Sequence, residues 1–270
     1  MLTRIITAVV GILVVIGIVS LGGFLMSAAV FAVAVLAWLE YARMMKKATP
    51  VYTKPALAAL ALILAAAVGA SLPVFFAAIV ACFIFLFFLI LVIQQKDMMS
   101  MFATVIGVLY FGIGFGSLLF LRDGDQLLAR SAVSIHAGVF LIWFAFIGTW
   151  ASDSFAYLIG KMCGKHKMAP HISPNKTVEG LAGGAVGCIA LCLGYAAVFD
   201  YSLIHAFLLS LMIAIAAPMG DLFESYIKRV CDVKDSGNLL PGHGGMMDRF
   251  DSLLFVAPLM VALLTGIRNF

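Results

Sequence analysis

Charged residues are scarce in this sequence. Lys, Arg, Asp and Glu make up 11% of its 270 residues, whereas a soluble domain carries roughly 25%. The 17 basic and 13 acidic side chains are too few to cover the surface of a water-soluble fold of this length, so that class is excluded. Hydrophobic residues reach 64%, which also excludes a disordered chain, because disorder requires low hydrophobicity. The apolar surplus must therefore face a lipid bilayer.

Cysteine is sparse as well, with five residues scattered along the chain and no pair at CxxC spacing. An odd, scattered set of this kind predicts neither a disulfide framework nor a zinc site. Cys82, Cys188 and Cys192 stand in apolar runs and are expected to pack as small hydrophobic side chains.

Apolar runs of about 20 residues, the length that a transmembrane helix needs, recur along the chain. We expect helices because an open sheet edge cannot satisfy its hydrogen bonds in hydrocarbon. Two boundaries are open, at Leu21-Gly22-Gly23 and at Ser71-Leu72-Pro73, where one long kinked helix is the alternative. The nine candidate spans lie at 5–21, 23–42, 55–71, 73–94, 99–121, 132–151, 177–199, 202–219 and 251–267.

The predicted fold is therefore all-α: a polytopic integral membrane protein of about nine transmembrane helices. The first apolar run is preceded only by Arg4 and lacks a small-residue cleavage region, so no cleavable signal peptide is expected. Neither an internal repeat nor a low-complexity linker is visible. We therefore expect a single membrane domain over residues 1–270, with N-terminal helices in 1–150 and the chemistry in 151–270.

The distribution of Lys and Arg predicts the orientation of these spans. With nine spans, 14 of the 17 basic residues fall on one side, and only Arg122, Arg130 and Arg268 fall on the other. The basic side is expected to be the cytoplasm, so the N-terminus lies inside and the C-terminus outside.

Acidic residues are concentrated in the second half of the chain. The first half holds only Glu40, Asp97, Asp123 and Asp125, each near an expected helix end, and these are interpreted as interfacial anchors. Ionisable groups at membrane depth are costly and are candidates for function. Eight of the 13 acids fall in 153–179 and 221–251: Asp153, Glu179, Asp221, Glu224, Asp232, Asp235, Asp248 and Asp251.

The stretch 221–252 combines acids, cations and glycines. If the eighth span continues as a helix through 230, its spacing places Asp221, Ser225, Lys228 and Arg229 on one face. The glycine-rich residues 236–245 can turn backbone N–H groups toward an anion, and the helix start that follows also favours one. Acids flanking a cationic, glycine-rich segment suit metal-assisted phosphoryl or nucleotidyl transfer. The alternative is a solvated, charged loop capped by Asp248.

The stretch 152–184 is a second polar cluster. Residues 173–180 have the pattern of a helix start, with Pro174 in the entering turn. Lys176 is unfavourable at a helix N-terminus, so it is expected to face an anion. The lysines of 161–167 fit two interpretations equally well: functional members of this cluster, or residues that anchor a loop on the basic side. The glycines of 180–187 are interpreted as helix-packing positions rather than a phosphate loop.

Residues 225–251 resemble the signature of the phosphatidate cytidylyltransferases, also called CDP-diacylglycerol synthases. Upstream, Asp153 to Lys161 and Ile172 to Gly180 are similar to a second conserved region of that family, with departures at Asn175 and Val178 that affect only local packing. The matching positions are Ser225, Ile227, Lys228, Arg229, Lys234, Asp235, Gly237, Leu240, Pro241, His243, Gly244, Gly245, Asp248, Arg249 and Asp251.

The resemblance implies transfer of a cytidylyl group from CTP to phosphatidate with release of pyrophosphate. It implies Mg²⁺ held by Asp221 and Asp248, with Asp251 as an additional or outer ligand; whether a second metal ion binds is left open. Phosphates would be bound by Lys228, Arg229, Lys234 and Arg249, and the turn His243-Gly244-Gly245 would offer an imidazole and backbone donors. The remaining substrate-binding candidates are Asp153, Ser173, Lys176, Ser225 and Asp235.

The same resemblance implies CTP, phosphatidate and membrane lipids as partners, a homodimer, and no nucleic acid. The site would face the cytoplasm from the inner (plasma) membrane. Two alternatives stay open. A CTP-dependent polyprenol or lipid-alcohol kinase would transfer the γ-phosphate instead, and the full 225–251 pattern argues against it. A transporter would need polar groups at the midplane of several spans, and the spans before 150 offer almost none.

Overall fold

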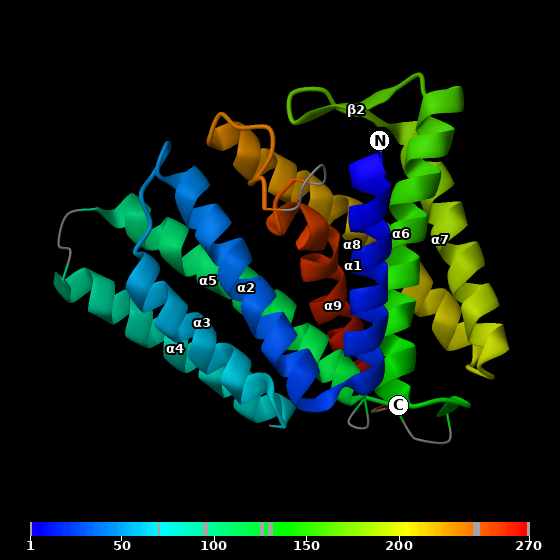
Figure 1. The fold of residues 1–270 in the computed structure, drawn as a ribbon, viewed down its shortest axis with the longest axis horizontal. Helices are drawn as coiled ribbons and strands as arrows, with labels where there is room; N and C mark the ends of the chain where they lie inside the picture. Colours follow the sequence, from blue (N-terminus) through cyan, green and yellow to red (C-terminus); the bar gives the residue numbers. More distant parts are fainter. Residues whose placement is uncertain are drawn as a thin grey trace. The chain divides into compact units, whose positions relative to one another are not determined.

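A computed structural model of the chain describes residues 2–69, 71–93, 97–124, 127–128, 132–239 and 244–268. These ranges contain nine α-helices and two short strands (Figure 1). The elements are α1 (Leu2–Leu21), α2 (Gly23–Met45), α3 (Thr53–Ala67), α4 (Leu72–Ile93), α5 (Met98–Asp123), α6 (Ala137–Cys163), β1 (Lys167–Ala169), β2 (Ser173–Thr177), α7 (Val178–Val198), α8 (Leu203–Val230) and α9 (Met247–Arg268).

The chain divides into two compact units, each described below by itself. Unit 1 comprises Met1–Leu119 and Ile227–Phe250, and unit 2 comprises Phe120–Tyr226 and Asp251–Phe270. The division falls inside α5, α8 and α9, so each of these three helices contributes residues to both units.

Seven helices of the described residues, α2 and α4 to α9, are long and apolar enough to cross a membrane. The all-α polytopic prediction is confirmed: the chain is an integral membrane protein. Helix α1 has 20 residues, about the length that a span needs. Helix α3 has 15 residues, about 22 Å of helix against roughly 30 Å of hydrocarbon. The count of nine spans and the orientation of the N-terminus stay predictions.

Both open boundaries separate two helices rather than kinking one. The helix α1 ends at Leu21, and the next residue, Gly22, has a φ of 63°. Between α3 and α4 the chain turns through Gly69, with a φ of 69°. Positive φ values suit glycine because it has no Cβ, so these glycines end the helices.

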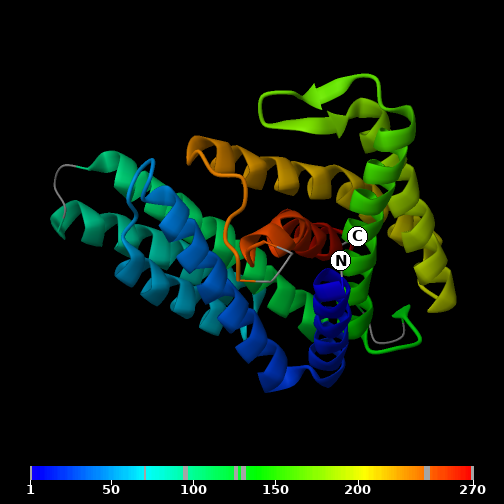
Figure 2. The ribbon, with the colours of Figure 1, turned by 45° about the horizontal axis from the view of Figure 1, so that its top comes forward.

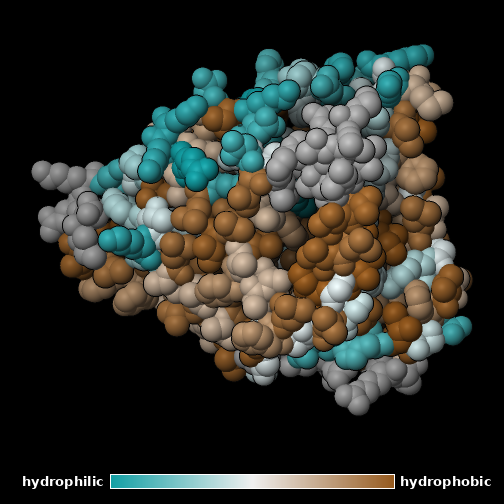
Figure 3. All heavy atoms as spheres, viewed as in Figure 1, coloured by the Kyte–Doolittle hydropathy of each residue, from teal (hydrophilic) through white to brown (hydrophobic). Residues whose placement is uncertain are grey.

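In unit 1, helix α4 packs along α3 (Figure 1) and has one buried and one exposed face. Phe75, Ile79, Leu86 and Ile90 are buried, whereas a stripe at i, i+4 spacing is 52–63% exposed: Phe76, Val80, Ile84 and Phe88. Apolar side chains are also abundant on the face seen in Figure 3. Exposed apolar stripes of this kind suit contact with lipid rather than water.

Helix α2 is held against α5 by aromatic side chains. Trp38 and Tyr41 of α2 lie 6.2 Å and 5.7 Å from Phe111 of α5, centroid to centroid, in edge-on geometry. The Tyr41 hydroxyl also donates to the carbonyl of Ala103 at 2.9 Å. These contacts fix the last turns of α2, where Glu40 lies.

In unit 2, α6 and α7 pack along one another (Figure 2). A Cβ added to Gly184 of α7 would lie 2.6 Å from the carbonyl oxygen of Ser152 on α6, and one added to Gly180 would lie 2.7 Å from that of Ala156. The backbones therefore approach closely where glycine stands, and the structure supports the interpretation of these glycines as packing positions.

The helix start expected at 173–180 is wrong in its first half. Residues 173–177 form β2, which pairs antiparallel with β1, with Lys167 opposite Thr177. Helix α7 begins only at Val178, because Thr177 has an extended backbone and its hydroxyl caps the helix by accepting from the N–H of Gly180 at 3.1 Å. A hairpin therefore joins α6 to α7, and α6 itself continues to Cys163, beyond the expected end at 151.

Candidate functional site

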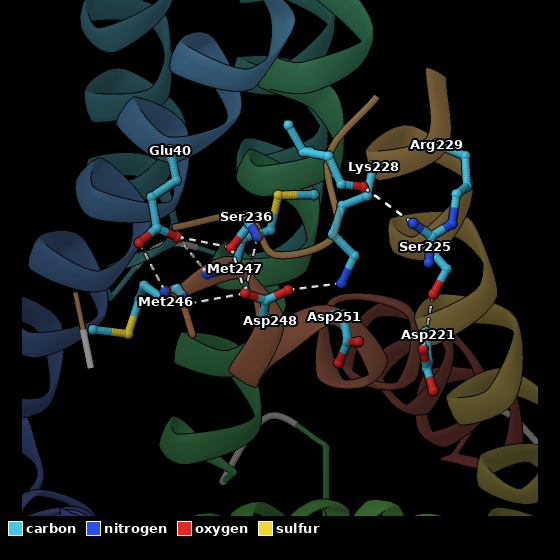
Figure 4. A network of polar contacts seen from close by, with 12 residues as sticks. Glu40, Asp221, Ser225, Lys228, Arg229, Ser236, Met246, Met247, Asp248 and Asp251 are labelled. Carbon is cyan, nitrogen blue, oxygen red and sulfur yellow. Dashed lines mark hydrogen bonds and ion pairs between the residues drawn. The ribbon is translucent and has the colours of Figure 1, made fainter. Parts of the chain in front are cut away.

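In unit 1, the Asp248 carboxylate is the centre of a buried polar cluster (Figure 4). Asp248 lies in the first turn of α9 with a side chain only 7% exposed, and its Oδ1 is 2.7 Å from the Nζ of Lys228, near the end of α8. Its Oδ2 accepts three hydrogen bonds: from the Ser236 hydroxyl at 2.8 Å, the Ser236 N–H at 3.1 Å and the Gly245 N–H at 2.8 Å. The carboxylate thus joins the end of α8, the following segment and the start of α9.

Glu40 of α2 is the second carboxylate of this cluster, and it is 5% exposed. It accepts hydrogen bonds from the backbone N–H groups of Met246 and Met247, each at 2.9 Å. The Ser236 hydroxyl lies 3.2 Å from Glu40 Oε2. A hydroxyl carries one proton, so Ser236 can donate to only one of the two carboxylates at a time.

The end of α8 turns tightly into this cluster. The N–H of Val233 donates to the carbonyl of Lys228 at 2.9 Å and that of Asp232 to the carbonyl of Arg229 at 3.0 Å, and Asp232 has a φ of 52°. This is a Schellman ending with an Asp at the left-handed position. Arg229 reinforces it by donating from Nη1 to the carbonyl of Val233 at 3.2 Å.

Cys231 ties the same segment to α2. Its thiol is buried and donates to the Sδ of Met45 at 3.5 Å. Burial raises the pKa of the Cys231 thiol, with a smaller opposing effect of Lys47, so the thiol stays protonated and able to donate.

Two glycines are required by the close packing around these carboxylates. A Cβ added to Gly245 would lie 2.5 Å from Glu40 Oε2, and one added to Gly237 would lie 2.7 Å from Glu40 Oε1. Gly244 has a φ of 82°, a left-handed conformation that favours glycine. The glycines of the motif therefore allow backbone and carboxylates to approach.

Three amides, one in the glycine-rich turn and two at the helix start that follows it, are directed toward carboxylates of the protein itself. The N–H of Gly245 is directed to Asp248, and those of Met246 and Met247 are directed to Glu40. A helix N-terminus attracts any nearby anion, and here the protein's own carboxylates occupy that place.

In unit 2, Asp221 of α8 lies in a separate polar cluster. Its Oδ2 is 2.6 Å from the Nζ of Lys176 on β2, and its Oδ1 is 3.4 Å from the Ser225 hydroxyl. Lys176 therefore faces an anion as expected, but from a strand and toward a protein carboxylate. A Cβ on Gly220 would lie 2.6 Å from the carbonyl oxygen of Asp251, so α8 and α9 abut where they carry Asp221 and Asp251.

Glu179 fixes the hairpin of unit 2 to the first turn of α7. It accepts from the backbone N–H groups of Lys165 at 3.0 Å and His166 at 3.2 Å. The Nδ1 of His166 lies 2.6 Å from the other carboxylate oxygen. The hairpin that carries Ser173 and Lys176 is thus held by a helix-start carboxylate.

The remaining expected site residues are distributed around these clusters. Ser173 is half-buried on β2, and His243 lies outside the described residues. Asp251 accepts the N–H of Ser252 at 2.6 Å. Five others are exposed: Asp153, Arg229, Lys234, Asp235 and Arg249.

A metal site has to be judged from the carboxylates themselves. Within the described part of the chain, no group of three or more His, Cys, Asp or Glu side chains is placed to hold a metal ion. Mg²⁺ usually needs only one or two carboxylates and completes its shell with water and substrate phosphates. Asp221 and Asp251 lie on helices that abut at Gly220. An ion at Asp221 would compete with Lys176 for Oδ2, and an ion at Asp248 would compete with Lys228 for Oδ1.

Glu40 and Ser236 are the members of the cluster that the sequence analysis missed. Glu40 was interpreted as an interfacial anchor because it lies near an expected helix end. The signal was nevertheless present, since an acid inside an apolar span is unusual. Ser236 gives no such signal, because a serine beside a glycine is common in any loop.

Comparison with known proteins shows the family of this chain. The profile described as "Cytidylyltransferase family" matches residues 2–266. The chain belongs to the cytidylyltransferase family. It is 43% identical over 161 residues to a phosphatidate cytidylyltransferase of Bacillus subtilis (strain 168), a match that covers 59% of this chain and 56% of that relative.

Two further relatives carry the same name. The chain is 38% identical over 187 residues to a phosphatidate cytidylyltransferase of Staphylococcus saprophyticus, covering 68% of this chain and 67% of the relative. It is 40% identical over 184 residues to that of Staphylococcus aureus (strain COL), covering 67% and 66%. Against the Bacillus subtilis relative, the match thus spans little more than half of the relative's length.

Proposed function

We propose that this chain is a phosphatidate cytidylyltransferase, which converts CTP and phosphatidate to CDP-diacylglycerol and pyrophosphate. An oxygen of the phosphatidate phosphate attacks the α-phosphorus of CTP, and the bond from that phosphorus to the oxygen bridging to the β-phosphate breaks. The nucleophile is already anionic, so no Ser, Cys or His nucleophile is needed. The protein must bind two polyanions together and stabilise the leaving pyrophosphate.

The buried ion pair of Lys228 and Asp248 carries this proposal. An ammonium held at 2.7 Å from a carboxylate, with side chains only 13% and 7% exposed, is fixed rather than mobile. It lies at one end of a segment whose sequence matches the signature of enzymes with this activity. We infer that Lys228 contacts substrate phosphate from this fixed position, together with the exposed Arg229, Lys234 and Arg249.

We further propose that the reaction uses Mg²⁺, with Asp221, Asp248 and Asp251 as the carboxylates that hold it. Bound there, the ion would neutralise charge on phosphate oxygens and orient the triphosphate. The supporting observation is the donor chemistry: hard carboxylate oxygens, which Mg²⁺ prefers. In unit 2, Lys176 and Ser225 hold the Asp221 carboxylate in place.

The proposal includes the side of the membrane on which the reaction takes place, the origin of the two substrates and the oligomeric state. The site faces the cytoplasm from the plasma membrane, because the segments 152–176 and 221–249 belong to the basic side of the predicted topology. CTP would arrive from the cytosol and phosphatidate from the bilayer. A homodimer is proposed on the family resemblance alone.

The test is pyrophosphate release by purified protein in detergent, with CTP, phosphatidate and Mg²⁺ each omitted in turn. We expect release only when all three are present, with CDP-diacylglycerol as the lipid product. A lipid-alcohol kinase would instead produce CDP and a phosphorylated alcohol when given a polyprenol. Release that does not depend on phosphatidate would contradict the proposal.

A further inference from the structure

Glu40 connects α2 to the segment between α8 and α9, a connection that no step of the proposed reaction requires. The three groups around its carboxylate are far away in sequence: Ser236, Met246 and Met247 stand 196, 206 and 207 residues further along the chain. One buried side chain therefore holds both described ends of the segment, near 236 and near 246 (Figure 4).

The groups around Glu40 suit a carboxylate and no amide. Oε1 faces the N–H of Met246, and Oε2 faces the N–H of Met247 and the Ser236 hydroxyl, so both oxygens meet donors. Glutamine at this position would turn an NH₂ donor toward one of these donors. Buried donors without an acceptor are costly, so even this isosteric change should disturb the segment.

From Glu40 the hydrogen bonds continue to the charged pair. The Ser236 hydroxyl reaches both Glu40 and Asp248, and the Gly245 N–H, next to Met246, binds Asp248. Asp248 in turn holds Lys228. We propose that Glu40 is a positioning residue, which acts through Ser236 and residues 245–247 to hold Asp248 and Lys228 in the arrangement used for nucleotidyl transfer. The catalytic part of this inference rests on the proposed function.

Cys231 offers a readout of the segment that is independent of activity. It is 1% exposed and is held against Met45 at the end of α2. Cys82, Cys188 and Cys192 are also buried, and Cys163 is exposed. In a Cys163→Ser background, a maleimide should therefore label the folded protein slowly. If the segment loosens, Cys231 should react first, and mass spectrometry identifies which cysteine carries the label.

The experiment compares Glu40→Gln with Asp97→Asn. Asp97→Asn is the same carboxylate-to-amide change in unit 1. Asp97 caps the start of α5, where it accepts the N–H of Ser100 at 3.1 Å. We expect Glu40→Gln to label at Cys231 alone. Its kcat should fall by about tenfold or more, the scale of one buried donor left without its acceptor, with KM for phosphatidate nearly unchanged. Asp97→Asn should match the parent protein in both measurements.

Ser236→Ala keeps the inference testable if Glu40→Gln does not fold. It removes only the hydroxyl between the two carboxylates, so we expect a smaller loss of kcat and intermediate labelling of Cys231. Label spread over Cys82, Cys188 and Cys192 as well would show a role in global stability and overturn local positioning. Parent-like labelling and kcat in Glu40→Gln would overturn it too. If the parent protein releases no pyrophosphate, the proposed function fails, while the labelling still reports on the segment.

Discussion

At the scale of single residues, Asp248 has several donors around one carboxylate, and its removal affects charge and structure together. In Asp248→Asn the amide cannot neutralise Lys228, and its NH₂ group faces donors on at least one side. We expect pyrophosphate release to fall by about 100-fold or more, as for loss of a preorganised charged group. Stability should also drop, by on the order of 3 kcal/mol for a broken, largely buried ion pair.

These two effects are measured by turnover and by thermal unfolding in detergent. Asp123→Asn is the control, because Asp123 is an exposed acid at the end of α5 and should change neither. Near-normal Mg²⁺-dependent turnover in Asp248→Asn would remove Asp248 from the proposed site.

Arg249 differs from Asp248, since it is exposed in the first turn of α9. Its proposed role is to bind phosphate through the planar guanidinium. Arg249→Lys keeps the charge and loses this bidentate geometry, so we expect kcat/KM for CTP to fall by about tenfold, the scale of one charge-assisted contact. Arg43→Lys, an exposed position of α2, should be silent. Full activity of Arg249→Lys would make Arg249 a helix-end anchor only.

At the scale of elements, the packing of α7 on α6 depends on glycine. A methyl group at Gly184 would meet the Ser152 carbonyl oxygen at 2.6 Å, so Gly184→Ala must push the helices apart. We expect a loss of about 1–3 kcal/mol, typical of overpacking, seen as a lower melting temperature. Gly194→Ala is the matched control in the same helix, because nothing lies within 4 Å of its Cβ position. There alanine should be neutral or stabilising.

The elements also show what the sequence could predict. Long apolar runs predicted the helices because hydrocarbon permits little else. Helix ends were less predictable. The polar residues 152–154 indicated the end of a span, yet α6 continues twelve residues past 151 to Cys163. The hairpin β1–β2 was missed because its lysines and Pro174 also fit a loop, and its support by Glu179 is a tertiary contact.

The same reasoning explains the site. The motif drew attention to Lys228, Gly245 and Asp248, but it predicted a substrate or metal role for each, and their contacts with one another appear only in the structure. It could not reveal Glu40, whose hydrogen bonds span about two hundred residues of sequence and depend on how α2 packs on α5. A local sequence pattern predicts which side chains can bind metal or phosphate. Tertiary packing determines which residues hold those side chains in position.

At the scale of the whole molecule, the asymmetric distribution of basic residues predicts an orientation that can be measured. If the basic side is cytoplasmic, the hairpin between α6 and α7 lies inside the cell and the turn between α7 and α8 lies outside. In intact cells, with Cys163 replaced by Ser, Lys165→Cys should react with an impermeant thiol reagent only after permeabilisation. Asp200→Cys should react without it. The native cysteines at 82, 188, 192 and 231 are buried and add little background. Labelling of Lys165→Cys from outside, together with protection of Asp200→Cys, would invert the topology and place the proposed site away from cytosolic CTP.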